Sequence, residues 1–359
     1  MVFFNLPISG TKQFLYTSRK LKKTLLSIVK TTAHCYVYNR ESHAISQNAP
    51  WNVLFFGTDE FSVESLKILH DKRKSKVLQR LEVVTVNKGK ENAIIKYAKE
   101  NGIIIHEWPI EINVPKKFHI GIVVSFGHLI PSNIIDSFPL GMLNVHASLL
   151  PRWRGAAPII YSLMNGEQET GVTIMKILPK KFDIGEIVLQ KQIDIGEHET
   201  LPELYAKLAK FGGNLLGDIF DNLPQLMKSA VPQNEMNVTY APKITSKIAS
   251  IKWNEMSASN VYNLYRALLG LYPLVTTFQN TTIKLHDIKK IEKPVPTELI
   301  EEMPGVVIYD KINSVLIIKC KEDCVSVKKV VVRGKPAMSA RDFNNGYIYG
   351  KNKTKEFFS

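Results

Sequence analysis

The 359-residue sequence predicts an α/β fold, a parallel sheet with helices on both faces, followed by a small β-barrel. Short apolar runs alternate with helical stretches between residues 51 and 223, which is the pattern of βα units in a parallel sheet. From residue 274 onward, short strands follow one another closely, as in a small barrel or sandwich. With 45% hydrophobic and 22% charged residues the composition is that of a folded chain, and the length suggests two domains.

The α/β region begins with its clearest strand. Residues 51–57 (WNVLFFG) form a continuous apolar run that ends in glycine, as a buried parallel strand does. A helix over residues 61–70 follows, and Asp59 stands where the start of a helix favours an acidic side chain. Ligands bind to such sheets at the carboxyl ends of the strands, near the point where the strand order reverses. Apolar patterns predict further strands at 81–86, 103–106, 120–125, 142–146, 170–177 and 186–193, and further helices at 93–101 and 201–223.

A polar segment separates the two regions. Pro232, Asn234, Asn237 and Pro242 punctuate residues 224–250, as in a linker. Beyond the linker, the sequence predicts a helix over 261–269 and strands at 274–278, 282–288, 305–309, 315–319 and 324–332. We therefore predict an N-terminal segment of residues 1–48, an α/β domain over 49–225, a linker over 226–250 and a C-terminal β-barrel domain over 251–359.

The net charge of +14 is unevenly distributed along the chain. Residues 1–50 carry 7 basic and 1 acidic residue, residues 51–240 carry 21 of each, and residues 241–359 carry 19 and 11. The middle of the chain is therefore neutral, and both ends are basic. A basic domain beside a neutral one favours an acidic partner such as a nucleic acid.

The basic N-terminal segment has the composition of a targeting peptide. Up to Asn39 it carries six basic residues, no acidic residue and several Ser and Thr, with Leu15, Leu21, Leu25 and Ile28 near one helical face. This pattern is typical of a mitochondrial transit peptide and predicts location in the matrix. A basic nucleic-acid-binding arm and a disordered tail are the alternatives. No apolar run reaches the roughly 18 residues of a membrane span, so we expect no contact with a membrane.

Missing motifs disfavour several cofactors. The turn after the first strand, residues 57–62, has one glycine rather than the three of a dinucleotide fingerprint, so we expect no NAD. The sequence also contains no phosphate-binding loop of the Gly-Lys-Ser/Thr type. The three cysteines, Cys35, Cys320 and Cys324, are too few and too scattered for a disulfide framework or a four-ligand zinc site, so we expect no metal.

Chemically informative residues gather at the end of the strand predicted at 142–146. Asn144 and His146 are two residues apart, so their side chains point to the same face of the sheet. An Asn amide can donate to a developing oxyanion, and a His can transfer a proton near neutral pH. Asp183, on a loop after the strand predicted at 170–177, is a candidate to orient the imidazole. The alternative is that Asn144 and His146 only cap a turn.

Residues 144–158 (NVHASLLPRWRGAAP), with Asp183 two positions before Gly185, closely resemble the signature of the formyltransferases that use 10-formyltetrahydrofolate. The Arg152-Trp-Arg154 form is most similar to the members of that family that act on methionyl-tRNA. The resemblance extends over about residues 51–348. It implies a Rossmann-like formyltransferase domain followed by an OB-like C-terminal domain, with a folate as formyl donor and methionyl-tRNA as acceptor. We expect the protein to be a monomer.

The same resemblance implies a role for each residue of the site. Asn144 would hold the formyl oxygen, His146 would stabilise the tetrahedral intermediate and help to move the proton of the attacking amine, and Asp183 would fix the imidazole tautomer. Arg152 and Arg154 would contact tRNA phosphates. The folate-binding residues implied are Ser148, Leu149, Leu150 and Pro151 in one turn, and Phe126 and Gly127 in the wall around the pterin.

Two other functions remain open on the sequence alone. The acceptor could be a small amine or an amino-sugar, although the basic C-terminal region argues against that. A catalytically inactive RNA-binding relative is the second alternative, which the intact Asn144, His146 and Asp183 disfavour. Bacterial members of the family have a long basic, glycine-rich loop where this chain has only residues 87–92. Discrimination between tRNAs is therefore expected to depend on other contacts.

Overall fold

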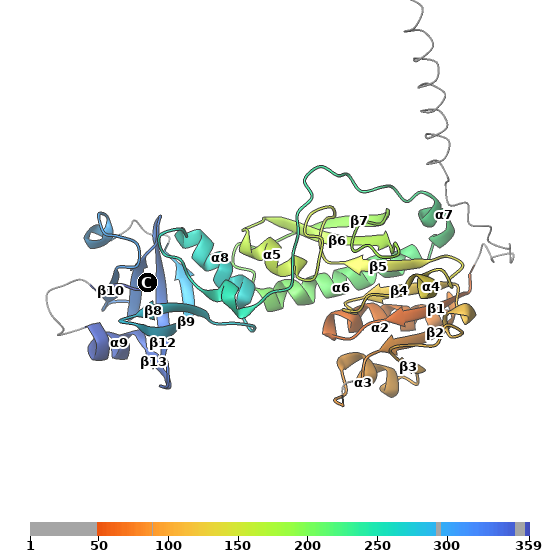
Figure 1. Cartoon of the computed structure of the whole chain (residues 1–359), viewed down its shortest axis with the longest axis horizontal. Helices are drawn as coiled ribbons and strands as arrows, with labels where there is room; N and C mark the ends of the chain where they lie inside the picture. Colours follow the sequence, from red (N-terminus) through yellow and green to blue (C-terminus); the bar gives the residue numbers. More distant parts are fainter. Residues whose placement is uncertain (1–48, 88, 292–295, 349–355) are drawn as a thin grey trace, which may run out of the picture. The chain divides into compact units, whose positions relative to one another are not determined.

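A computed structural model describes residues 49–87, 89–291, 296–348 and 356–359, so the predicted transit segment over 1–48 lies outside the described residues. The α/β region is built around a seven-stranded sheet in the order β3-β2-β1-β4-β5-β6-β7 (Figure 1). Its strands are β1 (Trp51–Phe56), β2 (Leu78–Thr85), β3 (Ile105–Glu107), β4 (Ile120–Val124), β5 (Met142–His146), β6 (Glu169–Lys176) and β7 (Ile187–Asp194). Its helices are α2 (Glu60–Lys74), α3 (Ala93–Glu100), α4 (Ser132–Ile135), α5 (Pro158–Met164), α6 (Leu201–Ile219) and α7 (Leu223–Lys228).

The predicted Rossmann-like α/β fold is confirmed, with one correction to the strand directions. Strands β1 to β5 pair in parallel with one another. Strand β6 is antiparallel to both β5 and β7, so the sheet is not wholly parallel. A reversed strand needs no crossover helix, because the chain returns along the same edge of the sheet. The connection between β5 and β6 therefore stays at the carboxyl end of β5.

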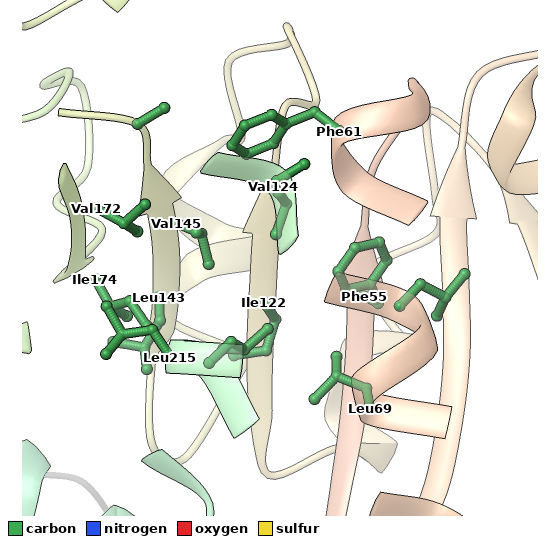
Figure 2. Close-up of a cluster of buried hydrophobic side chains, with 14 of the residues drawn as sticks. Phe55, Phe61, Leu69, Ile122, Val124, Leu143, Val145, Val172, Ile174 and Leu215 are labelled. Atoms are coloured by element: carbon green, nitrogen blue, oxygen red, sulfur yellow. The ribbon is translucent and has the colours of Figure 1, made fainter. Parts of the chain in front are cut away.

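Both faces of the sheet are buried, and alternating side chains set the register of the strands. Figure 2 shows Ile122 and Val124 of β4, Leu143 and Val145 of β5, and Val172 and Ile174 of β6 on one face, together with Leu69 of α2 and Leu215 of α6. Met142 belongs to the core on the opposite face, which includes Phe56 and Phe138. Since side chains alternate along a strand, Asn144 and His146 lie on the Met142 face.

The predicted helix over 201–223 is shorter than expected. Helix α6 begins with a capping box between Thr200 and Glu203 and ends at Ile219. Residues Leu223–Lys228 form a separate helix, α7, with Pro224 in its first turn. A proline is tolerated in a first turn but breaks the interior of a helix, which accounts for the division. Helix α5 was not predicted at all.

The C-terminal region is an antiparallel sheet in the order β10-β11-β12-β9-β8, with β13 paired to β12 (Figure 1). Helix α8 precedes it, and α9 follows β13. Their bounds are α8 (Ala258–Leu268), β8 (Leu274–Phe278), β9 (Thr281–Lys290), β10 (Val307–Asp310), β11 (Val315–Lys319), β12 (Cys324–Val332), β13 (Ala337–Ser339) and α9 (Ala340–Phe343).

Residues 356–359 bridge the two edges of this sheet. The backbone of Ser359 exchanges two hydrogen bonds with Thr277 of β8, at 2.8 and 2.9 Å. On the other side, Phe358 N donates to Gly305 O at 2.8 Å and Val307 N donates to Glu356 O at 3.2 Å. Strands β8 and β10 would otherwise present unpaired backbone groups, so this short segment closes the sheet into the predicted barrel-like form.

Among the described residues no helix is both long and apolar enough to cross a bilayer.

Phe358 is the side chain that holds the closing segment in place, so Phe358→Ala should destabilise the barrel. The ring is 1% exposed and lies 5.2 Å from Phe278 and 6.0 Å from Phe343 between centroids. We expect the free energy of unfolding, measured in urea, to fall by about 3–5 kcal/mol. The neighbouring Phe357→Ala is the control, because Phe357 is 59% exposed and its loss should cost less than about 0.5 kcal/mol. Equal losses in the two variants would contradict the closing role.

Candidate active site

A cavity of about 1090 Å³ opens at the carboxyl ends of β1, β4 and β5. Thr58 and Asp59 follow β1, residues 125–130 follow β4, and Asn144 and His146 belong to β5. The chain order of the strands reverses between β1 and β4, which makes this the switch point of the sheet. The cavity therefore lies where the fold places ligands.

The turns after β1 and β4 are joined by side-chain hydrogen bonds. Asp59 Oδ1 accepts from Ser62 N at the start of α2, while its Oδ2 accepts from Ser125 Oγ. Thr58 Oγ1 donates to Ser125 O at 2.7 Å. Phe126 and Gly127, which the family resemblance implies for the wall around the pterin, line the cavity, and the Phe126 ring lies 5.3 Å from that of Trp108. This wall is therefore held rigidly at the switch point.

Tyr205 of α6 reaches the same part of the cavity. Its hydroxyl accepts a hydrogen bond from Phe61 N at 3.0 Å. Burial, and secondarily the carboxylate of Asp59, raise the pKa of Tyr205, so the phenol keeps its proton at neutral pH. The sequence does not reveal Tyr205, because an aromatic residue on an amphipathic helix resembles an ordinary core residue.

Asn144, His146 and Asp183 come together at one end of the cavity. Asn144 Nδ2 lies 3.5 Å from Asp183 Oδ1, and His146 Nδ1 lies 3.8 Å from the same oxygen. Gly155 N donates to Asp183 Oδ2 at 2.8 Å. The side chains of His146 and Asp183 are 6% and 13% exposed. Two residues from one strand and one from a distant loop thus form a single cluster.

The tautomer of His146 is set by a backbone group that the sequence does not suggest. His146 Nε2 lies 3.0 Å from Trp153 O. A carbonyl oxygen only accepts hydrogen bonds, so Nε2 carries the hydrogen and Nδ1 faces Asp183. The expectation that Asp183 fixes the tautomer is therefore corrected: the carbonyl of Trp153 does so.

The loop that carries Asp183 is anchored at its C-terminal side. Gln233 Nε2 donates to Asp183 O and to Gly185 O, both at 2.9 Å. A Cβ atom on Gly185 would lie 1.7 Å from Lys176 O, so glycine is required there. Because β6 runs antiparallel to β5, this loop starts beside the amino-terminal end of β5. It then folds back over the face of the sheet that carries Asn144. Gln233 lies 50 residues from Asp183, and no local signal in the sequence indicates it.

The structure corrects the role expected for Arg154. Its side chain is 6% exposed, and Nε and Nη2 donate to Gln233 Oε1 at 3.1 and 2.8 Å. A guanidinium held in this way binds the polar segment after α7 rather than phosphate. Arg152 is 43% exposed but forms an ion pair with Glu167 and lies outside the cavity lining.

The turn Ser148–Pro151, expected to contact the folate, also lies outside the cavity lining. Ser148 is fully buried, and its Oγ donates to Arg152 O at 2.7 Å. Thr173 Oγ1 of β6 donates to Ser148 O at 2.7 Å and accepts from Leu150 N at 3.1 Å. The turn packs against β6 and shapes the loop that follows it.

Comparison with known proteins now gives the class. The family described as "Formyl transferase" matches residues 115–219, and "Formyl transferase, C-terminal domain" matches residues 243–348. The fold is shared with WlaRD, a sugar 3N-formyl transferase, at a TM-score of 0.58 and 17% identity over 80% of this chain and 100% of that one. HypX from Aquifex aeolicus in complex with tetrahydrofolic acid gives a TM-score of 0.54 at 12% identity, over 87% of this chain and 51% of that one. The chain is a formyltransferase.

Curated relatives narrow the family further. The chain is 37% identical to the mitochondrial methionyl-tRNA formyltransferase of Rattus norvegicus, over 87% of this chain and 82% of that protein. The human mitochondrial protein is 38% identical, over 85% and 80%. The methionyl-tRNA formyltransferase of Caldicellulosiruptor saccharolyticus is 30% identical, over 82% and 97%. The chain belongs to the methionyl-tRNA formyltransferase family.

Gly155→Ala should disable the site with little change elsewhere. Gly155 has φ +126°, and a Cβ atom there would lie 2.6 Å from Ala241 O. The strain would move Gly155 N away from Asp183, and a displacement of about 1 Å can lower turnover about a hundredfold. We expect that loss in kcat for formyl transfer. Gly346→Ala is the control, because a Cβ atom at Gly346 has no neighbour within 4 Å. Unchanged kcat in Gly155→Ala would contradict the role of this amide.

Proposed function

We propose that this protein transfers the formyl group of 10-formyltetrahydrofolate to the α-amino group of methionyl-tRNA in the mitochondrial matrix, for initiation of translation. The observation that carries the proposal is the cluster of Asn144, His146 and Asp183 at the end of a ligand-sized cavity. The family of the chain, and its mitochondrial relatives at 37–38% identity, support methionyl-tRNA as the acceptor and the mitochondrion as the location.

The cavity suits a folate in size and in lining. Its volume of about 1090 Å³ exceeds what an ordinary drug-sized ligand needs, which leaves room for an acceptor as well. Phe126, Ile130 and Ile177 give it an apolar wall that can pack against a bicyclic ring. Folate compounds are also named with solved structures of this fold, namely WlaRD and HypX.

Asn144 would stabilise the oxygen of the formyl group during attack. As the α-amine bonds to the formyl carbon, negative charge develops on that oxygen. The Asn144 amide is an uncharged donor whose bond to Asp183, at 3.5 Å, is long and weak. It can therefore donate to the oxyanion with little loss elsewhere.

His146 would carry the proton from the attacking α-amine to N10 of the folate. The α-amine has an ordinary pKa of about 7.7–8.0, so a usable fraction is uncharged. After the new C–N bond forms, Nδ1 of His146 can take the extra proton, because Nε2 is already engaged by Trp153. The resulting imidazolium faces the carboxylate of Asp183, 3.8 Å away. The proton then passes to N10 of the folate as its bond to the formyl carbon breaks, so bonds and protons balance.

Attraction of the tRNA would come chiefly from the C-terminal region. Residues 241–359 carry a net charge of +8, whereas residues 51–240 are neutral. At the cavity itself, Lys181 and Lys243 line the wall. Phosphate contacts of this kind supply affinity that does not depend on sequence. The C-terminal region would therefore attract the RNA, whereas the α/β region would carry out the chemistry.

Asn144→Ala should abolish most formylation while sparing binding. Loss of one oxyanion donor lowers kcat by about a hundredfold or more. We expect that fall with methionyl-tRNA, and a KM for methionyl-tRNA within about twofold of the unaltered protein. Asn214→Ala, an exposed position on α6, is the matched control and should be fully active. Full activity of Asn144→Ala would refute its role. An unaltered protein that formylates a small amine or amino-sugar, and not methionyl-tRNA, would refute the function.

Formylation should depend steeply on salt. Each phosphate contact made by a lysine adds nearly one unit to the slope of log affinity against log salt. Lys328→Ala, at an exposed position on β12, should therefore reduce the slope of log KM for methionyl-tRNA by about one. Lys96→Ala on α3 removes the same charge from the neutral region and should leave the slope unchanged. A shallow slope in the unaltered protein would contradict the electrostatic account.

A further inference from the structure

Glu167 lies on the turn between α5 and β6, outside the cavity lining, and takes no part in the mechanism above. Its Oε2 accepts a hydrogen bond from Trp153 Nε1 at 2.9 Å, and its Oε1 pairs with Arg152 Nη2. The Arg152 guanidinium in turn lies over the Trp153 ring, 5.3 Å from its centroid. One carboxylate thus holds both the edge of the indole and the cation that covers its face.

Trp153 is held in a conformation that a bulky residue rarely adopts. Its φ is +58°, in the left-handed region, which is strained for a bulky residue and persists only when neighbouring groups stabilise it. Thr239 Oγ1 accepts from Trp153 N at 2.8 Å. Glu167 and Arg152 hold the side chain. Trp153 is therefore held both through its backbone amide and through its side chain.

The carbonyl of that same residue meets the catalytic imidazole. Trp153 O accepts from His146 Nε2 at 3.0 Å, which keeps the hydrogen on Nε2 and turns Nδ1 toward Asp183. Rotation of the Trp153 peptide would remove the acceptor and leave either ring nitrogen able to carry the hydrogen. Orientation of the imidazole by a partner of this kind is what a general base requires.

We infer that Glu167 is a positioning residue for formyl transfer: by clamping the side chain of Trp153, it holds the carbonyl that sets the tautomer of His146. The inference rests on the proposed function, since His146 is the proton carrier there. The carboxylate is suited to this work because both of its oxygens accept, one from the indole and one from the guanidinium.

The alternative is that Glu167 and Arg152 form an ion pair with no role in catalysis. Arg152 is 43% exposed, and an ion pair at such an exposed site contributes little to stability. An ion pair without further role would change neither kcat nor the imidazole when removed. A role limited to presenting Arg152 to RNA would change KM for methionyl-tRNA and leave kcat unaltered.

The test compares Glu167→Gln with Glu169→Gln in steady-state formylation of methionyl-tRNA. Glutamine keeps the size of Glu167 but offers one acceptor oxygen, and its amide would face the Arg152 donors. We expect kcat to fall about tenfold or more, with both KM values within about twofold and thermal unfolding within a few degrees. Glu169→Gln makes the same charge change at an exposed residue that bonds Gln192 instead, and should leave kcat unchanged.

A double-mutant cycle separates the clamp from a general structural effect. Trp153→Phe removes the indole N–H, so Glu167→Gln added to it should cost little more, because both changes break the same contact. Independent, additive losses would overturn the inference. Nitrogen-15 NMR of His146 gives a readout besides activity. In the unaltered protein, neutral His146 should carry its hydrogen on Nε2. In Glu167→Gln, a mixture of the Nε2-H and Nδ1-H tautomers should be seen.

The outcomes also separate this inference from the function beneath it. If the unaltered protein does not formylate methionyl-tRNA, the proposed function fails, and the NMR comparison still decides whether Glu167 sets the tautomer. If the unaltered protein is active and Glu167→Gln retains its kcat, or raises only the KM for methionyl-tRNA, the inference alone is overturned.

Discussion

The carboxylate of Asp183 is the interaction on which the candidate site depends. A carboxylate that is 13% exposed must be satisfied by donors, because desolvation without partners is costly. Gly155 supplies an amide at 2.8 Å, and Asn144 approaches the other oxygen. Gly155 in turn lies against Ala241, whose nitrogen donates to Arg154 O at 2.7 Å. One charge therefore ties strand β5, the loop after it, the loop before β7 and the segment after α7 into a single unit.

The reversed direction of β6 is what brings those loops together. Since β6 starts beside the end of β5, the connection that contains α5 remains at the carboxyl edge, where Trp153 and Gly155 meet the imidazole and the carboxylate. The loop after β6 leaves beside the amino-terminal end of β5 and returns over the face of the sheet that carries Asn144. Gly185 permits the close approach to Lys176 that this return requires. A parallel β6 would need a crossover and would direct both loops elsewhere.

Local patterns in the sequence predict most of the strands but not their directions. The bounds of β5, β8, β11 and β12 agree with the predicted runs, because period-two alternation and apolar runs depend only on burial. The same patterns arise in a parallel and an antiparallel buried strand, so β6 could not be oriented. The spacing of Asn144 and His146 indicates a shared face. Gln233 and Tyr205 could not be found, since their importance depends on contacts made 50, 79 and 144 residues away along the chain.

The burial of Arg154 has a consequence for how an RNA acceptor would be held. Its guanidinium is committed to Gln233, and that of Arg152 is paired with Glu167, so neither arginine offers the site a full positive charge. Lys176, which lines the cavity, pairs with Glu186 at 2.7 Å. Strong attraction at the reacting atoms would stabilise the bound substrate as much as the transition state, and would not raise turnover. Placing the net positive charge in the C-terminal region lets affinity and chemistry be set separately, with Asn144 and His146 acting only as charge develops.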